Sequence, residues 1–412
     1  MMKIAFRAYA PLTATLLLAL GSVGCSGSGD DADDTGKAQA AVVKNYAEVV
    51  SANYADALAT AKDLDKAVKA FTADPSEATL EAAKEAWLVS RDPYGLSEAY
   101  RFYQGPIDND DGDDEIADGP EGQLNAWPLD ESHIDYVLDA KGAVVNGGII
   151  NLVDEFPTID RDALTGANGI DFDGLPSETS VSTGYHAVEF LLWGQDLSAE
   201  GPGARPYTDY VAGDDATAEN PDRRAEYLEV VSGMIVADLT SMVDAWADGE
   251  ANYRADFSAL PAKEALGKML LGMGSLSGAE LSGERMNVAY ENKEQEDEHS
   301  CFSDNTLKDL HNNATSVQDV LLGNYGKDLD GPGIDELVEA KDPALAKQLR
   351  DQIQDAIDNI DAVKGTFDNA IQGDDDNADR KRILAAIQSL QAFTETLTEA
   401  ADALNIDLKF DE

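Results

Sequence analysis

The sequence predicts an all-α protein made of two helical bundles. Apolar residues recur at helical spacing over long stretches, and no segment alternates convincingly with the period of two that marks a strand. The composition is rich in Ala, and aromatic residues make up only 7%, which favours helices over sheets. A chain of 412 residues is long enough for two domains, each with its own core.

Residues 1–25 are typical of the signal peptide of a bacterial lipoprotein. Lys3 and Arg7 supply the positive region, and the apolar run at 12–20 is too short to span a membrane. The box S-V-G-C places Cys25 as the lipidated residue. Because an aliphatic residue is more usual than Ser at the first position of this box, ordinary signal cleavage is the alternative.

Residues 26–38 predict a flexible acidic tether, since they hold few apolar residues around which to fold. A lipid on Cys25 would make the membrane a partner through its anchor. Ser26, rather than Asp, follows this Cys and favours sorting to the outer membrane. We therefore expect a lipoprotein of the bacterial cell envelope, held at the outer membrane and facing the periplasm or the cell surface.

The charge of the chain excludes one class of partner. Asp and Glu number 80 against 30 Lys and Arg, giving a formal net charge of −50. Nucleic acid is excluded, because binding phosphates requires a positive surface. Such acidity attracts cations, although adaptation to salty water would produce it as well.

An N-terminal bundle is predicted over residues 39–196. The spacing of apolar residues predicts a first helix at 37–71, and the break D-P-S ends with a new helix cap at Ser76. A second helix is expected over 76–103, with a kink at Pro93 because proline removes one backbone hydrogen bond. Two short helical pieces are expected next, at 133–138 and 144–156.

A polar connector at 197–222, containing Gly and Pro, separates this bundle from a C-terminal bundle at 223–412. Long amphipathic helices are predicted in the second bundle. Their expected ranges are 223–248, 261–291, 306–325, 343–371 and 376–404.

A short internal echo supports duplication of one bundle unit. Y-L-E-V-V-S at 227–232 differs from Y-A-E-V-V-S at 46–51 only in its second residue, and each opens a long helix. Both helices are followed by a second helix that carries an arginine, Arg101 or Arg285. We interpret the two bundles as related by internal duplication, although so short a match can also arise by chance.

The helix predicted at 182–194 carries the strongest chemical signal. His186 and Glu189 lie three residues apart, so both project from one face of a helix that is otherwise almost entirely apolar. Such a helix is normally buried, and a buried carboxylate needs a cation, a metal or hydrogen-bond donors. Ser182 or Thr183 would cap the helix. The bland alternative is a His–Glu hydrogen bond in the core.

Four blocks of sequence resemble those of the imelysin family. G-Y-H-A-V-E at 184–189 is similar to the G-x-H-x-x-E signature of that family. The other blocks are A-W-L-V-S-R-D-P-Y-G-L-S-E-A-Y-R-F-Y-Q-G-P-I-D at 86–108, L-N-A-W-P-L-D at 124–130 and E-D-E-H-S-C-F-S-D-N-T at 296–306. They follow the expected order and together span most of the mature chain. The resemblance implies an imelysin-like fold for the two predicted bundles.

Carboxylate and imidazole groups suit a divalent metal or iron, which is the cofactor that we expect. The H-E-x-x-H motif, paired Cys ligands, a G-x-S-x-G elbow and a P-loop are all absent from the sequence. His186 and Glu189 would supply two ligands. The resemblance adds candidates from the other shared blocks: Glu98, Glu298, His299 and Asp304.

The resemblance implies two functions of different classes. Members of the family are linked to bacterial iron acquisition, which implies metal binding and, for this chain, an iron-uptake partner protein or a peptide ligand. The family has also been classed as metallopeptidases, and Glu189 would then be a metal ligand or a catalytic base. We favour the iron-linked binding protein, with the metallopeptidase and a simple helical interaction module as alternatives.

Overall fold

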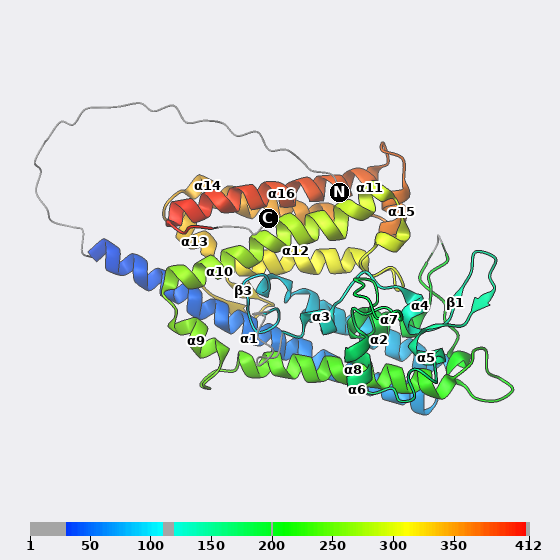
Figure 1. Cartoon of the computed structure of the whole chain (residues 1–412). Coiled ribbons are helices and arrows are strands. Elements are labelled where there is room, and N and C mark those ends of the chain that lie inside the picture. The colour runs from blue at the N-terminus through cyan, green and yellow to red at the C-terminus, as the bar shows by residue number, and fades with distance from the viewer. Residues whose placement is uncertain (1–29, 110–118, 199–200, 409–412) are drawn as a thin grey trace, which may run out of the picture.

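The computed structural model describes residues 30–109, 119–198 and 201–408, and it confirms the all-α prediction (Figure 1). The strands in these ranges form two small hairpins: β1 (Val137–Leu138) with β2 (Val144–Val145), and β3 (Asn324–Tyr325) with β4 (Leu329–Asp330). None of the described helices is both long and apolar enough to cross a membrane. The predicted signal peptide and Cys25 lie outside the described residues.

The first two helices follow the predicted pattern and differ at their ends. α1 (Asp30–Ala73) starts earlier than expected, so residues 30–38 are helical and not part of a flexible tether. Lys37 and Ala38 are good helix formers, which favours the extension of the helix beyond its buried face. Ser76 caps α2 (Glu77–Gly95) as predicted, in a reciprocal capping box with Thr79.

The second helix is shorter than the predicted range of 76–103. It ends at Gly95, two residues after Pro93, and the chain continues into the short 3₁₀ helix η1 (Glu98–Tyr100). Glycine and proline both weaken a helix, and the backbone N–H of Ala99 donates to Ser316 Oγ at 2.9 Å instead of continuing the helical ladder. This break releases Glu98 from the face of α2 and turns it toward the C-terminal half of the chain.

α1 and α2 pack against two further helices, α7 (Gly184–Trp193) and α8 (Pro221–Ala245). α8 runs alongside α1 in the lower part of Figure 1. The predicted connector at 197–222 therefore lies between two helices that contact one another, α7 and α8. The division into domains and the internal duplication stay predictions.

A buried cluster of ion pairs fastens the connector to α8. The carboxylate of Asp135 receives Arg205 Nη1 at 2.7 Å, and it also receives Arg224 Nε at 2.6 Å and Nη2 at 2.8 Å. Although burial disfavours the charge of Asp135, the two guanidinium groups outweigh it and lower the pKa of this carboxyl. Arg205 also contacts Asp209 of η2 (Tyr207–Tyr210), so the connector is held in place.

The C-terminal half is built around long helices, drawn in the upper part of Figure 1. α10 (Ala262–Ser275), a π-helical segment η3 (Leu276–Val288) and α11 (Ala289–Asn292) follow one another without a break. The segment η3 contacts α12 (Thr306–Leu322) and α16 (Ala378–Leu404). α14 (Pro343–Asp361) packs against both α12 and α16.

Several shorter elements complete the fold, and some depart from the predictions. The range 343–371 is two helices, because Gly365 adopts a positive φ of 95° between them. The pieces predicted at 133–138 and 144–156 are single helical turns joined by the β1–β2 hairpin. The remaining helices are α3 (Glu121–Leu124), α4 (Glu131–Ile134), α5 (Gly148–Asn151), α6 (Arg161–Ala167), α9 (Tyr253–Ala259), η4 (Gln295–Asp297), α13 (Ile334–Glu339) and α15 (Phe367–Gln372).

Candidate functional site

The site is organised around α7, in which every residue from Gly184 to Trp193 is buried. Gly184 has a φ of 85°, and a Cβ at this position would lie 2.5 Å from the carbonyl oxygen of Leu124. Only glycine permits this close approach. The indole of Trp87 in α2 donates to the carbonyl of Tyr185 at 2.9 Å, which fixes the first turn of α7. The backbone at the start of the G-x-H-x-x-E motif is thus held by contacts with Leu124 on one side and with Trp87 of α2 on the other.

The predicted side-chain cap of this helix is wrong. Thr183 is the cap residue, but its hydroxyl makes no capping hydrogen bond. Ser182 turns away and donates to the carbonyl of Leu164 at 2.7 Å. Tertiary contacts therefore replace the local cap at the start of α7.

His186 and Glu189 form the predicted pair inside the core. His186 Nδ1 lies 2.9 Å from Glu189 Oε2, and the exposed fractions of their side chains are 1% and 0%. The other carboxyl oxygen, Oε1, accepts the backbone N–H of Ser303 at 2.9 Å and its hydroxyl at 2.7 Å. Both oxygens of Glu189 are therefore engaged.

Burial sets the protonation of this pair. Desolvation, reinforced by Arg91, lowers the pKa of His186 to about 3. Desolvation raises the pKa of Glu189 to about 8, against the lowering effect of the Ser303 hydrogen bond. At neutral pH the imidazole is uncharged and the carboxyl keeps its proton.

The fold brings His299 next to His186. The centroids of the two imidazole rings lie 4.7 Å apart, and the ring planes are nearly perpendicular, at 79°. Trp127 also packs against His299, with ring centroids 5.6 Å apart. Burial, followed by the charge of Arg285, lowers the pKa of His299 to about 3. The site thus holds two neutral imidazoles in edge-to-face contact.

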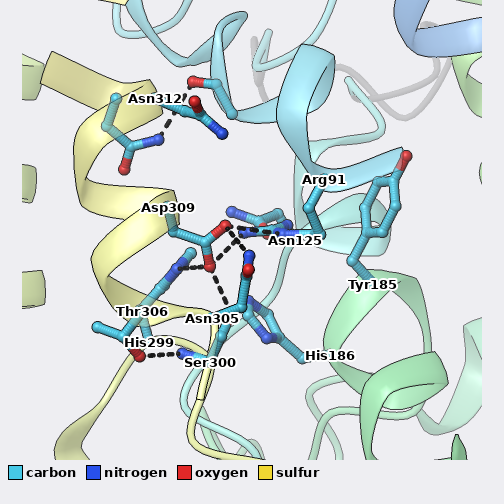
Figure 2. A network of polar contacts seen from close by, with 12 residues as sticks. Arg91, Asn125, Tyr185, His186, His299, Ser300, Asn305, Thr306, Asp309 and Asn312 are labelled. Atoms are coloured by element: carbon cyan, nitrogen blue, oxygen red, sulfur yellow. Dashed lines mark hydrogen bonds and ion pairs between the residues drawn. The ribbon is translucent and has the colours of Figure 1, made fainter. Parts of the chain in front are cut away.

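Asp309 of α12 contacts His299 and fixes its ring (Figure 2). Glu189 does the same for His186. Its Oδ2 lies 3.2 Å from His299 Nδ1 and also accepts the hydroxyl of Ser300. Arg91 donates Nε to Oδ1 at 3.2 Å and places Nη2 3.1 Å from Oδ2. Although burial opposes ionisation, Arg91 and His299 outweigh it and hold the pKa of Asp309 far below its usual range.

Glu98 belongs to an adjoining buried network. Its Oε2 receives Arg101 Nη1 at 2.7 Å and Arg285 Nη2 at 2.9 Å. Desolvation opposes its charge, but the two arginines prevail and lower its pKa to about 2. Asn125 links the networks, because it accepts Arg91 Nη1 at 2.7 Å and places its Nδ2 3.4 Å from Glu98 Oε1.

The π-helical segment orients Arg285 in this network. Arg285 lies five residues after Glu280, and its guanidinium contacts the Glu280 carboxylate at 2.9 and 3.1 Å. It also donates to Asn313 Oδ1 in α12 at 2.7 Å. Irregular π turns occur often at functional sites, and here one aims an arginine at Glu98.

Glu298 and Asp304 lie on the same segment as His299, between η4 and α12, but their carboxylates do not join the imidazole pair. Glu298 is fully buried, and no hydrogen bond of normal geometry reaches its carboxyl oxygens, although the Thr306 side chain is close enough to favour the ionised form. Burial raises its pKa well above the usual range, and the nearby carboxylate of Asp368 raises it further. Asp304 is half-buried with a φ of 59°, and burial raises its pKa to about 6.

The structure therefore brings three of the predicted residues together: His186, Glu189 and His299. Glu98 is linked to them only indirectly, through Asn125, Arg91 and Asp309. Across residues 30–109, 119–198 and 201–408, no three His, Cys, Asp or Glu side chains are grouped in a way that could hold a metal ion. The assignment of all six predicted residues as ligands stays a prediction.

Sequence reasoning missed the residues that support the pair. Asp309, Asn125, Ser303 and Arg91 received no role at the site. Asn125 and Ser303 lie inside the blocks at 124–130 and 296–306, so their position was a usable signal. Asp309 lies just beyond the block at 296–306, and only the tertiary structure places its carboxylate next to His299.

The two imidazoles have the features of metal ligands. Each Nδ1 is engaged by a carboxylate, whereas His186 Nε2 and His299 Nε2 are buried without any partner. A ligating histidine usually has its other nitrogen bound to a carboxylate, which fixes the ring. Leaving a buried nitrogen without a partner costs about 1–3 kcal/mol of stability, so a ligand bound by both nitrogens would remove this cost. The donor set suits a transition metal ion.

Known proteins give a consistent picture of this chain. The sequence model of the imelysin family matches residues 50–397. The chain is 23% identical to iron-regulated protein A of Synechococcus elongatus over 348 residues, covering 81% of this chain and 80% of that protein. Its fold is similar to the crystal structure of an iron-regulated protein A precursor from Parabacteroides distasonis, with a TM-score of 0.63 and 21% identity. That match covers 88% of this chain and 96% of the other. The chain belongs to the imelysin family.

Proposed function

We propose that this protein takes part in bacterial iron handling and binds a transition metal ion, iron foremost, between His186 and His299. The observation that carries the proposal is the pair of buried, unpartnered Nε2 atoms on rings whose centroids lie 4.7 Å apart. Two similar proteins are named as iron-regulated, which supports iron as the ion.

In this proposal Glu189 and Asp309 position the imidazoles, and they do not bind the metal directly. Each carboxylate contacts one Nδ1, so each imidazole would present Nε2 to the ion. Asp309 is ionised, and binding of the cation would favour release of the Glu189 proton, so that both carboxylates would then raise the basicity of the ligating nitrogens. Further ligands would come from water or from a molecule that carries the iron.

The proposal places the protein in the bacterial envelope. The expected lipid on Cys25 would anchor it at the outer membrane, where it would pass its ion to an uptake partner. The charge of −50 supports this role, since an acidic surface concentrates cations near the protein.

A metallopeptidase using the same residues is the alternative. Its active site would have to admit a peptide bond, and the side chains of His186, Glu189 and His299 are each at most 1% exposed. Burial of this extent favours a small ion over a peptide chain. The binding function is therefore the one that the geometry supports best.

Metal binding by the tag-free mature chain tests the proposal. The chain is stripped with a chelator and titrated calorimetrically with Fe²⁺ under anaerobic conditions, and with Zn²⁺. We expect His186→Gln and His299→Gln each to weaken binding by at least the roughly 10–100-fold that is typical of losing a supporting residue.

His311→Gln is the matched control, because this histidine is partly exposed and pairs with Asp361 away from the site. Thermal melts confirm that each variant folds. Unchanged affinity in both site variants would refute the metal-binding proposal. Cleavage of an unfolded protein substrate by the metal-loaded chain, lost in the same variants, would establish the peptidase alternative.

A further inference from the structure

The imidazole pair is closed off from solvent in this structure. The exposed fractions of His186 and His299 are each 1%, and both Nε2 atoms are buried without a partner. Glu189 and Asp309, the carboxylates that contact the two rings, have exposed fractions of 0%. An ion could therefore reach or leave the pair only after a neighbouring side chain had moved.

Trp127 differs from the carboxylates that contact the pair, because it is partly exposed. Its ring packs edge-to-face against His299, with centroids 5.6 Å apart and ring planes at 61°. Its indole Nε1 donates to the backbone carbonyl of Glu298 at 2.9 Å. One part of the indole thus meets solvent, while another part contacts a ring that solvent does not reach. Trp127 therefore covers the imidazole pair from the solvent side.

The loop that carries Trp127 is held at its two ends. At one end the backbone N–H of Asn125 donates to the carbonyl of Glu121 at 3.0 Å, and at the other the backbone N–H of Asp130 donates to the carbonyl of Thr179 at 2.8 Å. In the part of the chain that the structure describes, the residues between these ends make no backbone-to-backbone hydrogen bond. Segments with so few backbone bonds open at low cost. The closed position thus depends on the contacts of the indole itself.

We propose that Trp127 is a gate for the imidazole pair: its indole closes the route of the metal ion, and the loop moves outward to let the ion enter or leave. The purpose of the gate rests on the proposed metal-binding function, whereas the cover itself can be tested without a metal. A gate changes the rates at which an ion arrives and departs.

This role accounts for the block L-N-A-W-P-L-D at 124–130, which metal binding uses only in part. Asn125 of this block accepts Arg91 in the buried network, and Trp127 lies two residues later over His299. Tryptophan suits a cover, because its large ring excludes water and its N–H makes a hydrogen bond that fixes the closed position. The block thus joins the support of the site to its cover.

Chemical modification of the histidines tests the gate without a metal. Diethyl pyrocarbonate acylates accessible imidazoles, and mass spectrometry of peptides follows each of the 4 histidines separately. We expect His299 to react faster in Trp127→Ala than in the unaltered chain, by roughly tenfold or more. Trp127→Phe keeps a ring but loses the hydrogen bond to Glu298, so it should give a smaller rise. His311 is partly exposed, and its rate should stay the same in every chain.

Two controls separate a gate from a general loosening of the fold. Trp246→Phe changes an indole that packs against Tyr46 and Phe257, and it should leave His299 protected. His133 of α4 has an exposed fraction of 2% and should stay protected in every variant. Thermal melts confirm that each variant folds.

Stopped-flow measurements with Zn²⁺ add the functional readout. In Trp127→Ala we expect Zn²⁺ to bind faster and to leave faster to a chelator, each by roughly tenfold or more. Loss of a metal ligand would speed release alone. The paired change in the two rates therefore distinguishes a gate from a ligand.

Equal rates of His299 modification in the unaltered chain and in Trp127→Ala would overturn the gate. Equal acceleration at His133 and His299 would overturn it as well, because the fold as a whole would then have loosened. Faster modification of His299 in a chain that binds no Zn²⁺ would establish the cover and refute the metal-binding proposal. Zn²⁺ binding at the same rate in both chains would refute the gate and keep the metal site, so the two proposals fail separately.

Discussion

Arg91 of α2 and Asp309 of α12 form a buried ion pair, with Nη2 3.1 Å from Oδ2, although the residues lie 218 positions apart in the sequence. The exposed fractions of the two side chains are 1% and 0%. The same Asp309 carboxylate contacts His299, so this pair joins the N-terminal helices to the segment that carries the second imidazole. The stability of the fold and the geometry of the site thus depend on one contact.

Asp309→Asn should destabilise the protein strongly, because it leaves the Arg91 guanidinium buried without a counter-charge. We expect a loss of about 3–5 kcal/mol in the free energy of unfolding, measured by urea denaturation. Asp361→Asn removes a half-exposed carboxylate of the same type and should change stability by less than about 0.5 kcal/mol. Similar losses in the two variants would contradict the role of the buried pair.

Glu189→Gln should change stability in a pH-dependent way in the metal-free protein. The folded state holds the Glu189 proton up to about pH 8, whereas the unfolded chain releases it near 4.5. The folded state therefore binds more protons in this window, and the unaltered chain loses stability as pH rises through it. The variant lacks this loss, so its stability relative to the unaltered chain should increase from pH 5 to pH 8.5.

Urea denaturation of both proteins at the two pH values provides the measurement. Taking the difference between them cancels the contributions of the other titrating groups. A stability difference that is the same at pH 5 and pH 8.5 would show that Glu189 ionises in the fold as readily as in water.

Gly184→Ala should be severely destabilising. The new Cβ would meet the carbonyl oxygen of Leu124 at 2.5 Å, and the φ of 85° is unfavourable for any residue with a side chain. Gly166→Ala in α6 is the matched control, because no atom lies within 4 Å of its Cβ position. Thermal melts should show a large fall in melting temperature for Gly184→Ala. The melting temperature of Gly166→Ala should stay the same or rise, as expected for a gain of about 0.4–1 kcal/mol in the free energy of unfolding.

Ser303→Ala should weaken metal binding strongly while lowering the stability of the fold only slightly. It removes the hydroxyl that donates to Glu189 Oε1 at 2.7 Å but leaves the backbone N–H in place. We expect a loss of about 1 kcal/mol in stability and a 10–100-fold fall in transition-metal affinity. Ser177→Ala, a change at a partly exposed serine whose hydroxyl contacts Thr179, should affect neither quantity. Calorimetric affinities equal to those of the unaltered chain would show that Ser303 does not position the pair.

Local sequence determined the elements and one half of the site. The spacing of apolar residues predicted the long helices, and the three-residue spacing of His186 and Glu189 predicted their shared face. Ser76 was correctly predicted as a helix cap. Each of these features depends on residues within a few positions of one another, where helical geometry alone decides which side chains meet.

Only the tertiary structure decided what the pair faces. The second imidazole, the Asp309 carboxylate and the Arg285 guanidinium come from distant segments, and no spacing rule relates them to α7. The end of α2 at Gly95 and the failure of Ser182 and Thr183 to cap α7 have the same cause, since contacts with distant segments replaced local ones. A helix fixes the direction of a side chain, but the packing of helices fixes its neighbours, and those neighbours determine its charge and its chemistry.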